Sequence, residues 1–185
     1  GYAAVNGKIV PIKWSRASVD APYIYTLADG SFIVVDGGCA QDADHVYKAL
    51  KELNERKDGK IVVAAWIMSH HHGDHIGAFN TMADKEYAKE INIEQFIYNP
   101  TASTYAWRLM NAPYNYGGDF NFANYCNTFI TAKLAKFGDG NAKIINPHMG
   151  EVMQIRNADV EFLYTGDEDM FPLHMDNTND SSLVF

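Results

Sequence analysis

Four of the seven histidines fall within six residues, and an aspartate lies among them. The segment reads Ser69-His70-His71-His72-Gly73-Asp74-His75. Neutral imidazole nitrogens and carboxylate oxygens are the usual protein ligands of zinc and of similar divalent ions. These residue types therefore indicate a metal site, and with it the hydrolytic chemistry that paired metal ions support.

The spacing divides the cluster into two pairs. In an extended loop His70 and His72 point to the same side and can reach one ion, whereas His71 points away and is expected near the site without binding metal. A glycine then permits a sharp turn, so that Asp74 and His75 begin the next helix as a second pair. Two ions about 3.5–4 Å apart, with a water between them, suit this arrangement.

A run of histidines can also be an exposed loop or the remnant of an affinity tag. A tag would lie at a terminus, whereas this run is flanked by two structural elements. Before it, Ile61 to Met68 is almost continuously apolar, as in a strand buried on both faces. After it, Ile76-Gly77 opens a helical pattern. We therefore interpret the run as a metal site.

The elements before the cluster are mostly strands. Pro11 cannot donate to a ladder, so the strand from Lys8 to Trp14 is expected at an edge. Asp29-Gly30 predicts a hairpin between Tyr23–Leu27 and Phe32–Val35. A helix is expected from about Asp42, its N-cap, to Lys57, with Gly59 as its stop. Its apolar stripe consists of Val46, Ala49, Leu50 and Leu53.

The elements after the cluster mix helices and strands. We expect a helix over Ile76–Lys89, a strand over Glu94–Tyr98 and an insertion or lid over Asn99–Gly118. A second helix is expected over Asn121–Phe137, and its inward-facing residues are Phe122, Tyr125, Phe129 and Leu134. Further strands are expected at Lys143–Ile145, Val152–Ile155, Val160–Tyr164 after a turn at Asn157-Ala158-Asp159, and Ser182–Phe185. Together these elements predict a layered α/β (α+β) fold, in which ligands gather beyond the carboxyl ends of strands.

Composition indicates one folded domain, 1–185. The chain is 47% hydrophobic, enough for a single core. No apolar run approaches the roughly 18 residues that span a bilayer, and no signal peptide is apparent. We expect a soluble protein, either cytoplasmic or extracytoplasmic with its signal removed.

The net charge and the cysteines exclude few classes of function. A net charge of -8 disfavours tight general binding to nucleic acid, which depends on phosphate contacts, although a metal ion could attract a phosphate locally. Cys39 and Cys126 form a disulfide only if the fold brings them together. The cysteines therefore do not decide between an oxidising and a reducing compartment.

The pattern His70-x-His72-x-Asp74-His75 after an apolar strand resembles the signature of the metallo-β-lactamase superfamily, and Asp36-Gly37-Gly38 is similar to its earlier strand-end motif. The resemblance implies an αββα sandwich. It also implies that His70 and His72 bind the first metal ion and that Asp74 and His75 bind the second, with Asp36 close behind them. Asp36 could equally be a turn residue before two glycines.

The segment Asn179-Asp180-Ser181-Ser182-Leu183-Val184 resembles the DNA-uptake competence-protein branch of that superfamily. Relatives often carry a metal-binding histidine where this chain has Asn179, although the segment could also be a turn before a strand. Members of the superfamily continue past this point with further ligands. The resemblance therefore implies a sandwich incomplete at its C-terminus, which binds metal weakly and is inactive or nearly so. His148 and His174 could complete the ligand set, but a surface role is expected for His148.

The function implied by the resemblance is metal-dependent hydrolysis of a phosphodiester-type or other small-molecule substrate by a metal-bound hydroxide. Asp74 would orient the nucleophile, and two divalent ions would be required, zinc first, with manganese or iron as alternatives. Two other hypotheses stay open: a catalytically silent metal-binding or regulatory domain, and a di-iron redox site. Exposed strands of an incomplete sandwich also predict a homo-oligomer.

Overall fold

The structure, a computed structural model, describes residues 2–5, 8–11, 22–99, 129–165 and 182–185. Several predictions concern residues outside these ranges, and they stay predictions. They are the end of the first strand at residues 12–14, the insertion from residue 100, the start of the Asn121 helix with Phe122 and Tyr125, the pairing of Cys126, and the roles of His174 and Asn179.

One large sheet runs through the described residues. Its strands lie in the order β2-β1-β3-β4-β5-β7-β8, and β6 also pairs with β5. Their bounds are β1 Tyr2–Val5, β2 Lys8–Pro11, β3 Tyr23–Thr26, β4 Phe32–Val35, β5 Ile61–Ile67, β6 Ile91–Ile93, β7 Gln95–Ile97 and β8 Lys143–Ile145. The pairs β4–β5, β5–β6, β5–β7 and β7–β8 are all parallel. The α/β class is therefore confirmed.

Local sequence signals placed several of these strands. β2 lies at the edge of the sheet, the position predicted for a strand that contains Pro11. β3 and β4 pair antiparallel across a turn in which Gly30 has a φ of 78°. A residue without a Cβ adopts that angle without strain. β5 is buried along its whole length, as its continuous apolar run predicts.

A β-bulge changes the phase of β5. Phe32 of β4 pairs with Val63, but the next residue, Ile33, pairs with Ala65, so that Ala64 is an extra residue on β5. As a result Val63 and Trp66 pack on one face of the sheet, while Ala64 and Ala65 both belong to the cluster on the other face. The bulge therefore sets the direction in which the residues after β5 leave the sheet.

The helices agree with the predictions in place but not in bounds. A 3-10 turn, Ala40–Asp42, leads into α1, Ala43–Leu53, whose expected stripe faces the core. The predicted start is confirmed, because Asp42 occupies the N-cap position of α1. The predicted end was wrong, because the helix stops at Leu53 rather than Lys57. Asp42 makes no side-chain cap on α1. Instead its Oδ2 accepts a hydrogen bond from the backbone N–H of Cys39, 2.9 Å away.

The second helix starts earlier and ends sooner than predicted. α2 covers Gly73–Met82, and a separate 3-10 helix covers Glu86–Glu90. The chain is also helical over 129–134. Leu134 is buried as predicted, but the inward placement of Phe129 was wrong. Phe129 is 46% exposed, and the neighbouring Ile130 is buried instead. Among the described residues, no helix is long and apolar enough to cross a membrane.

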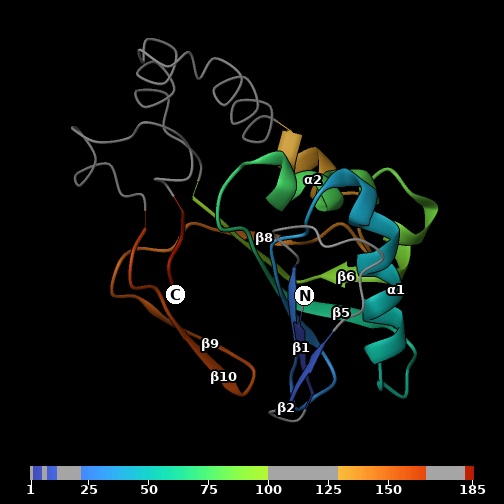
Figure 1. Cartoon of the computed structure of the whole chain (residues 1–185), viewed down its shortest axis with the longest axis horizontal. Coiled ribbons are helices and arrows are strands. Elements are labelled where there is room, and N and C mark those ends of the chain that lie inside the picture. The colour runs from blue at the N-terminus through green and yellow to red at the C-terminus, as the bar shows by residue number, and fades with distance from the viewer. Residues whose placement is uncertain (1, 6–7, 12–21, 100–128, 166–181) are drawn as a thin grey trace.

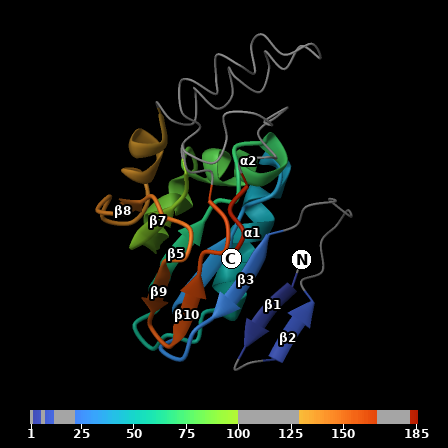
Figure 2. The ribbon, with the colours of Figure 1, turned by 90° about the vertical axis from the view of Figure 1, so that its left-hand side faces the viewer.

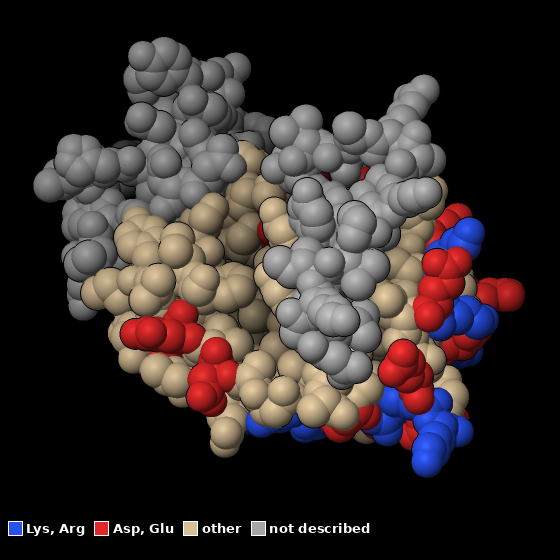
Figure 3. Space-filling view, turned by 60° about the horizontal axis from the view of Figure 1, so that its bottom comes forward, with Lys and Arg blue, Asp and Glu red and all other residues tan. Residues whose placement is uncertain are grey.

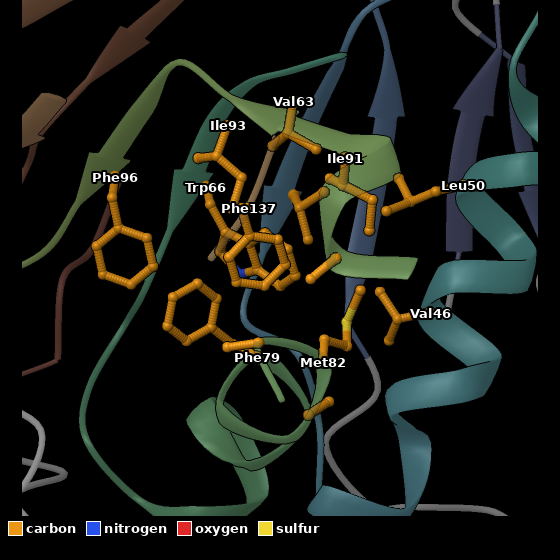
Figure 4. Packing of buried hydrophobic residues seen from close by; sticks show 14 of the residues in the cluster. Val46, Leu50, Val63, Trp66, Phe79, Met82, Ile91, Ile93, Phe96 and Phe137 are labelled. Atoms are coloured by element: carbon orange, nitrogen blue, oxygen red, sulfur yellow. The ribbon is translucent and has the colours of Figure 1, made fainter. Parts of the chain in front are cut away.

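The layers are defined by two apolar clusters on opposite faces of the large sheet. The first joins α1, α2 and the 129–137 region to the sheet around Trp66, Phe79 and Phe137 (Figure 4). The second joins the sheet to an antiparallel hairpin of β9, Val152–Ile155, and β10, Ala158–Glu161. Figures 1 and 2 show α1 and this hairpin on opposite sides of the sheet. Three layers of the expected αββα sandwich are thus present in the described part of the chain.

The hairpin of the third layer is fixed at its turn. The turn lies at Arg156 and Asn157, one residue earlier than predicted, and Arg156 has a φ of 58°. The Arg156 guanidinium donates to Asp29 at 2.9 Å and to Glu94 at 2.5 Å. The side-chain oxygen of Asn157 accepts a hydrogen bond from the backbone N–H of Ala28. The second sheet is therefore tied to the end of the large sheet opposite the histidine cluster.

Candidate metal centre

The candidate site forms where two parallel strands end side by side. Asp36 follows β4, and the loop Ser69–His72 joins β5 to α2. The ladder continues one step past the strands, because the backbone N–H of Asp36 donates to the carbonyl oxygen of Ile67 at 2.8 Å. The backbone N–H of Ser69 in turn donates to Oδ1 of Asp36 at 2.8 Å. Parallel pairing thus brings the two motifs together.

The chain after β4 approaches α2 very closely. The backbone N–H of Gly37 donates to the carbonyl oxygen of His75 at 2.7 Å. On the helix side the close contact requires Gly77, because a Cβ there would lie 2.7 Å from the backbone nitrogen of Ala40. Asp36 itself has a φ of 54°, an uncommon angle for a residue with a side chain. Packing therefore holds both Asp36 and His75 in place.

His70 and His72 point their rings toward each other. The Nε2 atom of His70 lies 3.1 Å from the Nδ1 atom of His72, and the ring centroids are 4.8 Å apart. Two nitrogens bound to one tetrahedral zinc ion, each at about 2.0–2.1 Å, would be separated by about 3.3–3.4 Å. The observed distance is close to that value, so this pair of nitrogens fits a shared divalent ion. It is also a hydrogen-bond distance, so in the metal-free chain one of the two nitrogens carries a proton, which a metal ion would replace.

His75 completes a three-ring group on the other side of His70. Its ring centroid lies 3.9 Å from that of His70. Its Nδ1 atom lies 2.9 Å from Oδ2 of Asp36. A carboxylate only accepts hydrogen bonds, so Nδ1 carries the proton and the lone pair of His75 is on Nε2. Asp36 therefore lies directly behind the histidines and orients one of them, in the way outer carboxylates orient metal-binding histidines.

Burial makes two of the imidazoles poor bases. Burial, followed by the neighbouring rings of His75 and His72, lowers the pKa of His70 to about 4. The charges of Asp36 and Asp74 act in the opposite direction but are outweighed. Burial likewise lowers the pKa of His71 to about 4. At neutral pH His70 is therefore an uncharged imidazole, the form that binds a metal ion.

His71 points away from the other rings. It is 1% exposed, and its ring meets that of Tyr98, at the end of β7, edge-on at a centroid distance of 5.7 Å. This is the alternation that an extended loop predicts. Its position indicates a packing role beside the site.

The remaining predicted residues are placed less tightly. Asp74 is half-buried in the first turn of α2, where a carboxylate also stabilises the helix N-terminus. His148 lies exposed in a loop after β8, as expected for a surface residue. Within the ranges that the structure covers, no three or more His, Cys, Asp or Glu side chains form a group that could hold a metal ion. The fit therefore extends to the pair His70 and His72 and not to a full ligand set.

Sequence reasoning missed Ser69. Its hydroxyl donates to Oδ2 of Asp36 at 2.8 Å and lies 3.0 Å from Nδ1 of His70. Its carbonyl oxygen accepts a hydrogen bond from the backbone N–H of Leu183 at 2.9 Å. A signal was available, because Ser69 is the first polar residue after the apolar run of β5. The pairing of β5 beside β4, which brings it to Asp36, could not be read from that position.

The comparison with protein families agrees with this geometry. The model of the metallo-beta-lactamase superfamily matches residues 19–169, which include Asp36 and all of Ser69–His75. The chain therefore belongs to the metallo-beta-lactamase superfamily. Its members are mostly metal-dependent hydrolases, and they usually bind divalent metal ions, often zinc. A search of curated proteins found no significant match.

Proposed function

We propose that this protein is a metal-dependent hydrolase in which His70 and His72 hold the first divalent ion. The observation that carries the proposal is the 3.1 Å distance between Nε2 of His70 and Nδ1 of His72. Membership of a superfamily of mostly hydrolytic enzymes supports it. Asp74 and His75 are proposed to serve a second ion, because they open the helix that follows directly.

Zinc is the proposed metal, with manganese or iron as alternatives. Imidazole suits zinc and iron, and added carboxylates suit manganese. When bound, such an ion supplies Lewis-acid activation of water and stabilises negative charge on the substrate.

The chain's own residues prepare the site for that chemistry. Asp36 accepts a hydrogen bond from Nδ1–H of His75 and so fixes the direction of that ring. His70 stays uncharged at neutral pH, which keeps a lone pair available. We propose that the carboxylate of Asp74 acts as the catalytic group that orients the attacking nucleophile. The segment from Asn99 to Tyr116 is proposed to shape the substrate pocket, and residues 100–116 of it lie outside the described ranges.

A small-molecule phosphodiester is the proposed substrate. The basis is the resemblance of the segment from Asn179 to Val184 to the competence-protein branch, and the family match ends before that segment. The net charge of -8 makes nucleic acid a less favoured substrate. On the face shown in Figure 3, basic side chains lie among acidic ones and form no separate patch.

The test is hydrolysis of bis-p-nitrophenyl phosphate after loading with zinc, manganese or iron. We expect slow turnover, because the pair His70 and His72 is the only part of a ligand set that the described residues show to fit. Asp74→Ala should abolish it. Asp44→Ala is the matched control, since Asp44 also lies in the first turn of a helix, α1. Equal loss in both variants, or none in either, would contradict the role of Asp74.

The same experiment separates the competing functions. Elemental analysis by mass spectrometry identifies the metal that co-purifies. Bound metal without turnover of any phosphodiester would favour a silent binding or regulatory domain. Bound iron that changes oxidation state, again without hydrolysis, would favour a di-iron redox site.

Self-association is proposed as well. A cavity of about 460 Å³ opens between β3 and the β9–β10 hairpin, and the exposed apolar residues Tyr25, Leu163 and Phe185 line it. Exposed apolar surface beside a strand edge favours pairing between chains. Light scattering should show a mass that rises with protein concentration, and a constant monomer mass would contradict this.

A further inference from the structure

The hydroxyl of Ser69 lies at the centre of the histidine cluster. It is 2.8 Å from Oδ2 of Asp36, 3.0 Å from Nδ1 of His70 and 3.3 Å from Nδ1 of His75. Its backbone is fixed from two sides, by Asp36 at its N–H and by Leu183 at its carbonyl oxygen. Ser69 therefore has little freedom to turn its side chain elsewhere.

The direction of these hydrogen bonds follows from counting protons. A serine hydroxyl has one proton and can otherwise only accept, and a carboxylate can only accept. The proton of Ser69 therefore goes to Asp36. Toward His70 the same oxygen must then be the acceptor, which requires the proton of the neutral His70 ring to be on Nδ1. The lone pair of His70 is consequently on Nε2, the atom that faces His72.

We propose that Ser69 is a positioning residue that forms a hydrogen-bond relay between Asp36 and His70. Its hydroxyl donates to Asp36 and accepts from Nδ1–H of His70, and so holds this ring in its Nδ1–H tautomer. Without the relay, Nδ1 and Nε2 of His70 would compete for the proton. A ring protonated on Nε2 would present an N–H to the point that it shares with His72. Asp36 would thus set two rings at once, His75 directly and His70 through Ser69.

The tautomer itself does not depend on a metal ion, whereas its consequence for metal affinity rests on the proposed function. Residues that orient metal-binding histidines typically change metal affinity by about 10–100-fold when they are replaced. We therefore expect Ser69→Ala to weaken zinc binding by about tenfold or more. Ser69→Thr keeps the hydroxyl and should restore both tautomer and affinity.

The experiment reads the tautomer of His70 in the whole metal-free chain, labelled with ¹⁵N on histidine, by long-range ¹H–¹⁵N correlation at pH 7.5. The wild-type protein should show His70 protonated on Nδ1, and Ser69→Thr should look the same. Ser69→Ala should shift His70 toward the Nε2–H form, while an amide spectrum that matches the wild type away from the site reports that the variant is folded. Zinc titration of the same three samples gives the affinities.

Two results would overturn the proposal. The first is a wild-type His70 protonated on Nε2, a measurement that needs no variant to fold. The second is a Ser69→Ala protein that keeps the Nδ1–H form, or a Ser69→Thr protein that behaves like it. If the tautomers change as expected but the wild-type chain binds no zinc, the relay stands and the proposed hydrolase function fails.

Discussion

The Nδ1 atom of His75 lies 2.9 Å from Oδ2 of Asp36, although 39 positions separate them in the sequence. Asp36 directly follows β4, and His75 lies in the first turn of α2. The contact therefore joins the strand layer to the helix layer at the point where the histidines converge. Both side chains are mostly shielded from water, at 14% and 17% exposure, so the pair is little screened by solvent.

Replacing Asp36 by asparagine tests that contact. The carboxylate accepts from the Ser69 backbone N–H at Oδ1 and from the Ser69 hydroxyl and His75 at Oδ2. The amide keeps the shape but has only one accepting oxygen, so it cannot satisfy all three donors. We expect the free energy of unfolding to fall by about 1–3 kcal/mol and zinc affinity to fall by about 10–100-fold. Asp159→Asn, an exposed carboxylate in β10, serves as control. Equal effects in denaturant titrations of both variants would argue against a special role for Asp36.

Two glycines of the same helix give a matched pair of substitutions. A Cβ at Gly77 would lie 2.7 Å from the backbone nitrogen of Ala40, whereas a Cβ at Gly73 would meet nothing within 4 Å. Gly77→Ala should therefore destabilise the protein by about 1–3 kcal/mol through overpacking. Gly73→Ala should leave stability unchanged or raise it by up to about 1 kcal/mol, because alanine favours helix. Thermal unfolding that ranks the variants in the opposite order would contradict the close approach of α2 to residues 38–40.

Stability should depend on pH in the acid range. The pKa of His71 is about 4 in the folded protein, against about 6.5 in an unfolded chain. Between these values the unfolded state binds more protons, so the stabilisation is fully present above pH 6.5 and is lost as the pH falls toward 4. Each such histidine contributes a slope of up to about 1.4 kcal/mol per pH unit. His70 adds to the slope in the same direction.

The origin of that slope can be checked with two matched variants in the presence of a chelator. His71→Phe keeps a ring against Tyr98 and should make the free energy of unfolding less dependent on pH between 6.5 and 4. His148→Phe, at an exposed site, should leave the slope unchanged. Identical slopes in the two variants would show that burial of His71 is not the cause.

Arg156 allows strain and ion pairing to be separated. Its φ of 58° disfavours any residue with a Cβ, and its guanidinium pairs with Asp29 and Glu94. Alanine and glycine both lose the ion pairs, but only glycine adopts the angle without strain. Arg156→Gly should therefore be more stable than Arg156→Ala by about 1 kcal/mol. A urea titration with equal midpoints would mean that the hairpin turn relaxes in both variants.

Much of the site followed from short-range pattern. The alternation of side chains in an extended loop is enough to separate His71 from its neighbours, and a continuous apolar run is enough to bury β5. The hairpin at Asp29-Gly30 needed only local turn chemistry.

Other features depend on contacts that no local pattern records. The bulge at Ala64 arises from the register between β4 and β5, and it decides which way the loop leaves the sheet. Ser69 gained its place from the same pairing. Helical spacing predicts that Phe129 points inward, but the packing against the sheet buries Ile130, one position further on. In each case tertiary contacts override the local signal.

Zinc titration calorimetry on three proteins tests the central claim most directly. The wild-type chain, His72→Ala and His148→Ala are compared under identical conditions. A metal ion shared by Nε2 of His70 and Nδ1 of His72 predicts measurable binding to the wild-type chain, unchanged in His148→Ala and at least tenfold weaker in His72→Ala. The same affinity in all three proteins, or no zinc binding by the wild-type chain, would contradict it.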